Sequence, residues 1–373
     1  EEKEEKEENF RDEERLVREN IQCPAWSLAC SRQEVETLVG DLLRVFQEHL
    51  SNSFFLVPQP AIGVGSAFEG WSPCGHDTVY SLLVPLKPSR GHAFQPELGT
   101  VGDVPAKHRV RVELVCTCMK DSRVEDMLCF IHQPRNVLKR NQDSSLLSKL
   151  CTGRYLNAQK TACWFQDLVS SAWEETPHSR HYSLRVLPSR RSCKLELTSA
   201  SRRSLCVEML FGVQLGNSDV FLSSQAPEAI FTRGTMWAES SAVAEAKFFS
   251  HVARQALPDS VHLKCLQLCT SSLAGTVLSS YIFKTVMMHV LNMYPMTSWT
   301  RAVFAIQLQD VMCYLHSCLE KKCLNHFIFG NKCLPEDIIL PQATQRAEPV
   351  NLFQCLVQDP EAYAKALCEF QQL

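Results

Sequence analysis

The feature that most constrains the fold is a change in hydrophobic period partway along the chain. The middle is rich in alternating runs typical of strands, including 77–86, 108–118 and 204–215, and carries a helical insert. From Trp237 onward, apolar residues recur at helical spacing almost to the end. This order predicts an α+β protein, in which a mixed-sheet core is followed by a helical C-terminal lobe.

The N-terminal residues carry a different pattern. Residues 1–20 hold ten acids and five bases and offer no apolar face, so a solvated helix or linker is expected there. A helix with a capping box, Ser31 and Glu34, is predicted to begin at Ser31. The expected domains are an acidic linker or juxtamembrane segment (1–30), an α/β domain (31–236) and a helical domain (237–373).

Net charge and cysteine content limit which partners and which redox environment the chain can have. The net charge of -3 gives no surplus for binding a polyanion, so no nucleic-acid partner is expected. Most of the 18 cysteines lie in apolar runs, and there is no Asn-x-Ser/Thr sequon, which favours free thiols in a reducing compartment. If the globular part of the chain faced an oxidising extracellular environment instead, some of these cysteines would form disulfides. The cysteine content therefore leaves open on which side of a membrane this part would lie.

No apolar run reaches the roughly 18 residues of a membrane span. No signal peptide is recognisable either. The chain begins with Glu rather than Met, so we expect that further sequence, with room for a span or a signal, lies upstream.

The stretch GSAFEGWSPCGHDTVYSLLVPL, residues 65–86, raises the question of catalysis. It combines a Gly-Ser turn, Gly65 and Ser66, with Asp77 at the start of a strand-like run. Each feature alone is common: Gly-Ser is an ordinary turn, and an isolated Asp before a strand is usually a solvated turn residue.

Three separated stretches together carry a family resemblance. They are the Gly-Ser turn with the run Asp77 to Pro85, then LSSYIFKTVMMHVL (278–291), and then LNHFIFGNKCLP (324–335) with AEPVNLFQCLVQDP (347–360). The first two resemble the Mab-21-like nucleotidyltransferase superfamily, which includes cyclic GMP–AMP synthase. The third resembles its inositol trisphosphate receptor-interacting protein-like branch. This implies a bilobal nucleotidyltransferase-like fold with a cleft between the lobes.

The resemblance also implies roles for individual residues of that cleft. Gly65 and Ser66 match the phosphate-cradling turn, while Asp77 and Glu208 match the second and third metal-binding carboxylates. Ser280 and Tyr281 match a pair that faces the nucleotide base, and Lys284 follows one turn later. Read without the resemblance, Ser280 and Tyr281 are a helix cap and a packed aromatic.

The first carboxylate of the pattern falls on Gly75, and there the match fails. Magnesium requires oxygen ligands in near-octahedral geometry, which Gly75 cannot supply and for which His76 is a poor substitute. Glu69 could replace the missing metal ligand only if its side chain extended to the site from the preceding segment. Loss of a metal ligand normally abolishes such a site, so the predicted protein is not an enzyme and holds neither metal nor cofactor.

Two further constellations carry weaker signals than the cleft. His262, Cys265 and Cys269 share one helical face and begin a zinc-site pattern, but so apolar a helix usually buries its cysteines, and no fourth ligand is apparent. The basic residues Arg190, Arg191, Arg202 and Arg203 lack the interleaved aromatics of a nucleic-acid platform. Nor is there any counterpart of the zinc-binding insertion of cyclic GMP–AMP synthase, which argues against DNA sensing.

The sequence thus predicts a non-catalytic, protein-binding module, and the family resemblance implies a single-pass membrane protein with its span upstream. The implied partner is a membrane receptor. Two alternatives stay open: a metal-dependent nucleotidyltransferase that uses Asp77 and Glu208, and a sensor that binds a nucleotide or inositol phosphate through Lys284 and the Gly65–Ser66 turn.

Overall fold

A computed structural model gives the fold of this chain. The structure describes residues 25–50, 56–72, 78–89, 91–98, 107–116, 131–132, 149–225, 233–271 and 277–372. The predicted acidic segment of residues 1–20 lies outside this part of the chain, as do Gly75, His76 and Asp77.

The strands of the described residues form one large mixed sheet. They are β1 (Val57–Pro58), β2 (Ile62–Val64), β3 (Val79–Lys87), β4 (His92–Leu98), β5 (Lys107–Leu114), β6 (Cys151–Thr152), β7 (Tyr155–Leu156), β8 (Tyr182–Leu187), β9 (Ser192–Ser199), β10 (Ser204–Gln214), β11 (Phe221–Ser223) and β12 (Met236–Ser240). The order runs β1-β3-β10-β11-β12-β5-β7-β6, with β2 on β3, β4 on β5, β9 on β10 and β8 on β9. Among the pairings described, β3 with β10 is parallel and the others are antiparallel.

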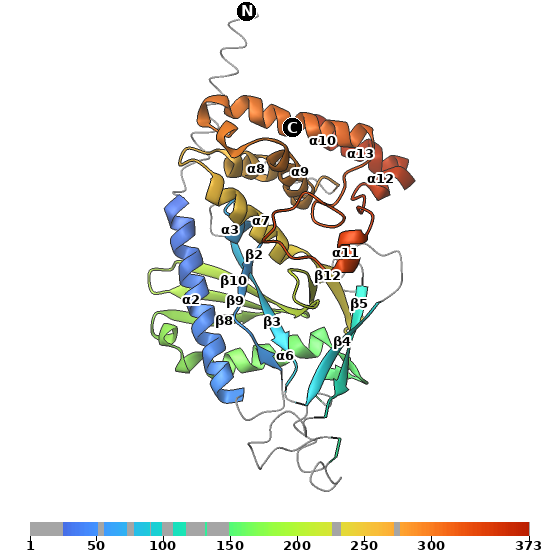
Figure 1. Cartoon of the computed structure of the whole chain (residues 1–373). Coiled ribbons are helices and arrows are strands. Elements are labelled where there is room, and N and C mark those ends of the chain that lie inside the picture. The colour runs from blue at the N-terminus through green and yellow to red at the C-terminus, as the bar shows by residue number, and fades with distance from the viewer. Residues whose placement is uncertain are drawn as a thin grey trace, which may run out of the picture.

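Helices cover the sheet and then build a second lobe at one end of it (Figure 1). The helices are α2 (Ala25–Leu50), α3 (Ser66–Glu69), α6 (Ala158–Ala172), α7 (Ala242–Gln255), α8 (His262–Ser271), α9 (Ser280–Met293), α10 (Phe304–Glu320), α11 (Gln342–Arg346), α12 (Gln354–Gln358) and α13 (Pro360–Gln371). Short 3₁₀ turns lie at Trp173–Glu175, Pro177–Arg180, Met296–Ser298 and Arg301–Val303. The predicted α+β class, a nucleotidyltransferase-like sheet core followed by a helical lobe, is confirmed.

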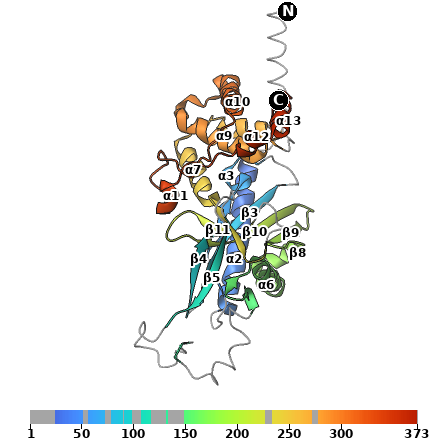
Figure 2. The same cartoon turned by 90° about the vertical axis from the view of Figure 1, so that its right-hand side faces the viewer.

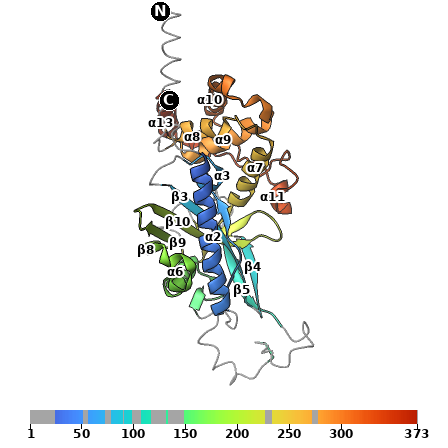
Figure 3. The ribbon, with the colours of Figure 1, turned by 90° about the vertical axis from the view of Figure 1, so that its left-hand side faces the viewer.

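Each lobe has its own hydrophobic core. In the sheet lobe, apolar residues of α2 and α6 pack against the strands, with Phe165 between Phe46 of α2 and Phe211 of β10. Figures 2 and 3 show α2 running along the sheet with α6 nearby. In the helical lobe, α9 lies at the centre and buries nine of its fourteen residues. This extensive burial explains why most of its sequence is apolar.

The start of α2 differs from the prediction. The helix begins at Ala25, so Ser31 lies inside it and the predicted capping box is wrong. Ser31 is buried and accepts a hydrogen bond from Arg203, while Glu34 accepts one from the hydroxyl of Tyr182. The two polar residues fix α2 to the β8–β10 region instead of capping it.

The change of period also falls later than predicted. Trp237 lies on strand β12, and the helical segment begins only at Ala242. The indole of Trp237 is fully buried in the sheet core and donates to the carbonyl of Leu156. The short strand β11 lies inside the sheet, between β10 and β12.

One helical stretch of the described residues, Arg301–Glu320, is long and apolar enough to cross a membrane by length and composition. Its Val311, Leu315 and Leu319 are buried in the core of the helical lobe. Only 28% of the most apolar window is buried, so α10 packs one face against this core; length and composition alone are weak evidence, and we assign no span to it.

Candidate functional site

The Gly65–Ser66 turn brings a carboxylate to the junction of the two lobes. Gly65 adopts a φ of 77°, which glycine reaches without strain, and α3 follows at once. Ala67 packs in the sheet core, whereas Trp71 packs in the helical core. Glu69, between them, has a side chain that is 0% exposed.

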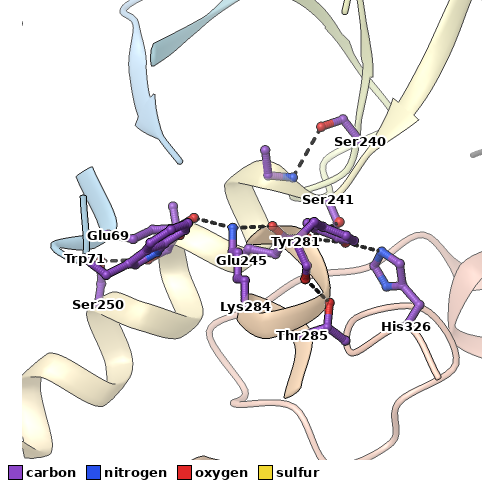
Figure 4. Close-up of polar contacts among 12 residues, drawn as sticks. Glu69, Trp71, Ser240, Ser241, Glu245, Ser250, Tyr281, Lys284, Thr285 and His326 are labelled. Atoms are coloured by element: carbon purple, nitrogen blue, oxygen red, sulfur yellow. Dashed lines mark hydrogen bonds and ion pairs between the residues drawn. The ribbon is translucent and has the colours of Figure 1, made fainter. Parts of the chain in front are cut away.

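Lys284 of α9 neutralises this carboxylate and a second one (Figure 4). Its Nζ lies 2.6 Å from Glu69 Oε1 and 2.5 Å from Glu245 Oε2, on α7. The Lys284 side chain is only 6% exposed. The remaining carboxylate oxygens are also satisfied: Trp71 Nε1 donates to Glu69 Oε2 at 2.7 Å, and Ser241 Oγ donates to Glu245 Oε1 at 2.7 Å.

Tyr281 and His326 extend this network toward the C-terminal segment. The hydroxyl of Tyr281 donates to Glu245 Oε1 at 2.9 Å and lies 2.8 Å from His326 Nε2. Because His326 Nδ1 accepts from the backbone N–H groups of Ile328 and Phe329, the ring proton must sit on Nε2, which donates to Tyr281. We call Glu69, Trp71, Ser241, Glu245, Tyr281, Lys284 and His326 the Lys284 cluster.

Burial and charge set the ionisation of the cluster. Burial raises the pKa of Glu69 despite its contact with Lys284. Burial acts in the same direction on Glu245, but Lys284, His326 and Ser241 together outweigh it and lower the pKa of Glu245 to about 2. Burial alone would lower the pKa of Lys284, and the two carboxylates raise it instead. Burial lowers the pKa of His326, which therefore stays neutral. The ammonium of Lys284 is thus permanently charged and held by the protein's own acids.

The other predicted cleft residues are not part of this cluster. Ser280 is exposed at the start of α9. Glu208 lies on β10 opposite Ser81 of β3, accepts from Ser192 Oγ at 2.7 Å, and lies 3.5 Å from Lys194 Nζ. Gly75 and Asp77 lie outside the described residues, so the structure does not test the predicted carboxylate pair. It does bring the Gly65–Ser66 turn, Tyr281 and Lys284 to one place.

Four residues of the cluster, Trp71, Ser241, Glu245 and His326, were not predicted, although the sequence held a signal for Glu245 and a weaker one for His326. Glu245 is the single acid in the first turn of an apolar helix, flanked by the buried Val243, Ala244 and Phe248. A buried acid must find a partner, and Lys284 is a lone charge on an equally buried helix. His326 gives a weaker signal, because its role depends on a turn that positions its ring.

The candidate zinc residues are buried as expected of a core helix. His262, Cys265 and Cys269 are buried on α8, and no group of three or more candidate ligands among the described residues could hold a metal. Both ring nitrogens of His262 lack a hydrogen-bond partner, and burial lowers its pKa to about 4. His262 is therefore a neutral core residue with unsatisfied polar atoms.

Replacing His262 with Leu is expected to raise the free energy of unfolding by about 1 kcal/mol at pH 7, because it removes unpaired buried polar atoms. The variant is also expected to lose less stability than wild type as the pH falls from 6.5 to about 4, where the unfolded state takes up a proton that folded His262 does not. Urea unfolding measures both. The exposed His316→Leu control should change stability at pH 7 by less than about 0.5 kcal/mol. A destabilised His262→Leu, or a wild type stabilised by zinc, would contradict this assignment.

The charged groups of the Lys284 cluster already have partners within the protein. All four carboxylate oxygens of its two glutamates accept hydrogen bonds, and its ammonium is shared between those two acids. A metal ion would have to displace Lys284, and a phosphate would have to displace both glutamates. The arrangement serves to join α3 of the sheet lobe to α7 and α9.

Comparison with known proteins agrees with this architecture. A family profile described as "Mab-21 protein HhH/H2TH-like domain" matches residues 262–336, within the helical lobe. This match identifies the helical lobe as Mab-21-like and agrees with the observed order of a mixed-sheet core followed by a helical lobe.

Relatives that align with nearly the whole of this chain identify its family more specifically. The chain is 35% identical over 367 residues to inositol 1,4,5-trisphosphate receptor-interacting protein-like 1 of Mus musculus, covering 95% of this chain and 66% of that protein. The Rattus norvegicus protein of the same name is 35% identical over 366 residues, with the same coverage. Inositol 1,4,5-trisphosphate receptor-interacting protein of Homo sapiens is 30% identical over 370 residues, covering 92% of this chain and 67% of that protein. This chain belongs to the inositol 1,4,5-trisphosphate receptor-interacting protein family and spans about two thirds of the length of these relatives.

Proposed function

We propose that this chain is the non-catalytic, protein-binding module of a membrane-associated receptor-interacting protein. The observation that carries the proposal is the Lys284 cluster. The one cation that the Mab-21-like pattern puts in the cleft is already paired with Glu69 and Glu245, at 2.6 and 2.5 Å. Neither Glu69 as a metal ligand nor Lys284 as a phosphate ligand is free to act.

The remaining carboxylates give catalysis little support. Gly75 occupies the position of the first metal ligand in the sequence pattern and has no side-chain oxygen. Glu208 shares its Oε1 between Ser192 and Lys194. Phosphoryl transfer needs carboxylates that converge on the metal ions, and with Gly75 at the first position the sequence pattern offers only Asp77, which lies outside the described residues, and Glu208.

The partner and the membrane attachment are part of the same proposal. The relatives carry the name of inositol 1,4,5-trisphosphate receptor-interacting proteins, which motivates a receptor as the partner. We propose that attachment uses a single span upstream of residue 1. The predicted acidic segment would then hold the module away from anionic headgroups.

Nucleotide binding and turnover test the absence of catalysis. The purified chain is mixed with ATP or GTP in magnesium or manganese, and its thermal shift and product formation are measured beside an Asp77→Asn, Glu208→Gln double variant. A ligand at a hundredfold excess over its dissociation constant would stabilise the fold by about 2.7 kcal/mol. We expect no metal-dependent shift and no product from either protein.

Metal-dependent product from wild type, lost in the double variant, would overturn the proposal. Saturable stabilisation by a nucleotide or inositol phosphate without turnover would support the sensing alternative instead. The receptor is tested separately, by co-precipitation of the full-length protein from detergent-solubilised membranes with antibodies against the inositol trisphosphate receptor.

A further inference from the structure

The C-terminal end of α10 holds two cysteines in a fixed backbone motif. The N–H of Cys323 donates to the carbonyl of Cys318 at 2.9 Å, and the N–H of Lys322 donates to the carbonyl of Leu319 at 3.0 Å. Lys322 has a φ of 50°, the left-handed conformation. These three features define a Schellman motif, in which the third residue from the helix end and the second residue beyond the cap are brought into contact. Here those two residues are Cys318 and Cys323.

The motif brings the two residues within disulfide range. Their backbones share a hydrogen bond of 2.9 Å, so standard bond lengths cap the separation of the two Cα atoms at about 6.8 Å. Disulfides span Cα separations of about 4.4–6.8 Å. The Cys323 sulfur also contributes to raising the pKa of Cys318.

The two thiols differ in accessibility. Cys323 is exposed and lies 3.6 Å from Asn325 Oδ1. Cys318 is buried, and burial raises its pKa to about 11. Another close pair, Cys265 and Cys269 on α8, is buried at both positions and therefore shielded from an oxidant. Cys318 and Cys323 combine a fixed geometry with one exposed sulfur.

We propose that Cys318 and Cys323 are an oxidation site that forms a disulfide with a small-molecule disulfide such as oxidised glutathione. The Cys323 thiolate attacks one sulfur of the oxidant, releasing one glutathione and forming a mixed disulfide. Cys318 then loses its proton and attacks the Cys323 sulfur, which expels the second glutathione. Two thiols are oxidised and one glutathione disulfide is reduced to two glutathiones.

The disulfide would act on the segment that leads into the Lys284 cluster. Asn325 pairs with Asn351 in a β-bridge, and the backbone carbonyl of Asn325 lies 2.8 Å from His289 Nε2. His326 follows directly and contacts Tyr281. Linking Cys323 to α10 would fix the first residue of this segment and remove the Cys323–Asn325 contact. The proposal does not depend on the absence of catalysis.

Tryptic mapping tests the site without relying on activity. The reduced chain is equilibrated in glutathione buffers of increasing oxidised fraction, alkylated and digested. Trypsin cleaves after Lys321 and Lys322, so a 318–323 disulfide joins two peptides that separate on reduction. We expect this linked pair to be the main product of mild oxidation.

Serine variants make the assignment unique, since Cys313 lies in the same tryptic peptide as Cys318. Cys313→Ser is expected to keep the linked pair, and Cys318→Ser to reduce it to background. A circular-dichroism spectrum checks that each variant is folded. Loss of the link in Cys313→Ser, pairing of Cys323 with another peptide, or a glutathione adduct on Cys323 that never resolves would each overturn the proposal.

Discussion

Replacing Lys284 with Met is expected to reduce the free energy of unfolding by about 3–5 kcal/mol. The substitution leaves Glu69 and Glu245 without their shared cation in a site where their side chains are 0% and 4% exposed. Removing one partner from a buried ion pair costs far more than the pair itself contributes, because the remaining charge stays desolvated. Urea unfolding at pH 7, followed by tryptophan fluorescence, measures the loss.

Two further variants define the cause of that loss. Arg185→Met removes an exposed partner of Glu196 and should cost at most about 1 kcal/mol. A triple variant, Glu69→Gln, Lys284→Met and Glu245→Gln, removes every formal charge and should recover at least half of the loss. If Lys284→Met costs no more than Arg185→Met, the cluster is not the interlobe joint that we describe.

Acid is expected to destabilise the fold through Glu245. Its pKa falls from 4.5 in the unfolded chain to about 2 in the folded state, so its stabilising contribution is complete above pH 4.5 and is lost as the pH falls toward 2. The difference corresponds to about 3 kcal/mol. Urea unfolding midpoints measured between pH 2 and 7 report this loss of stability at acid pH. In the Glu245→Gln variant the midpoint should depend less on pH between 4.5 and 2.

Glu69 should act in the opposite sense in the same experiment. Its pKa is raised in the folded state, so the folded state holds a proton that the unfolded state releases above pH 4.5. Its contribution is therefore greatest below pH 4.5 and declines as the pH rises through the folded pKa. Glu69→Gln should remove the decline in stability above pH 4.5 and keep the loss of stability between pH 4.5 and 2. The same response from both variants would contradict the opposite shifts.

Long segments with a clear period were predictable from the sequence. The strands β3, β5 and β10 and the helices α7 to α10 follow the alternating and helical patterns of their residues. Strand β4 was missed, because HAFQPEL contains Pro96 and depends on seven pairings with β5 rather than on its own propensity. Strand β12 was merged into the following helix, because five residues are too few to show a period.

The candidate site was less predictable, for a physical reason. The sequence identified Lys284 but not its partners, Glu69 and Glu245, which lie 215 and 39 residues away along the chain. Local patterns report which residue is buried, whereas its partner is fixed by how distant elements pack. The sequence showed Glu69 only as a carboxylate near the Gly65–Ser66 turn, and nothing local indicated that α9 would place a cation against it.

The position of α3 also has a consequence for how the molecule unfolds and how it can be divided. Ala67 belongs to one core and Trp71 to the other, so one short segment contributes to both. Severing the chain near residue 237 would therefore deprive the C-terminal half of Trp71 and Glu69, although every helix from α7 onward would be retained. The two lobes are therefore expected to melt as one cooperative unit, and residues 262–336, which match the Mab-21 profile, are not expected to fold by themselves.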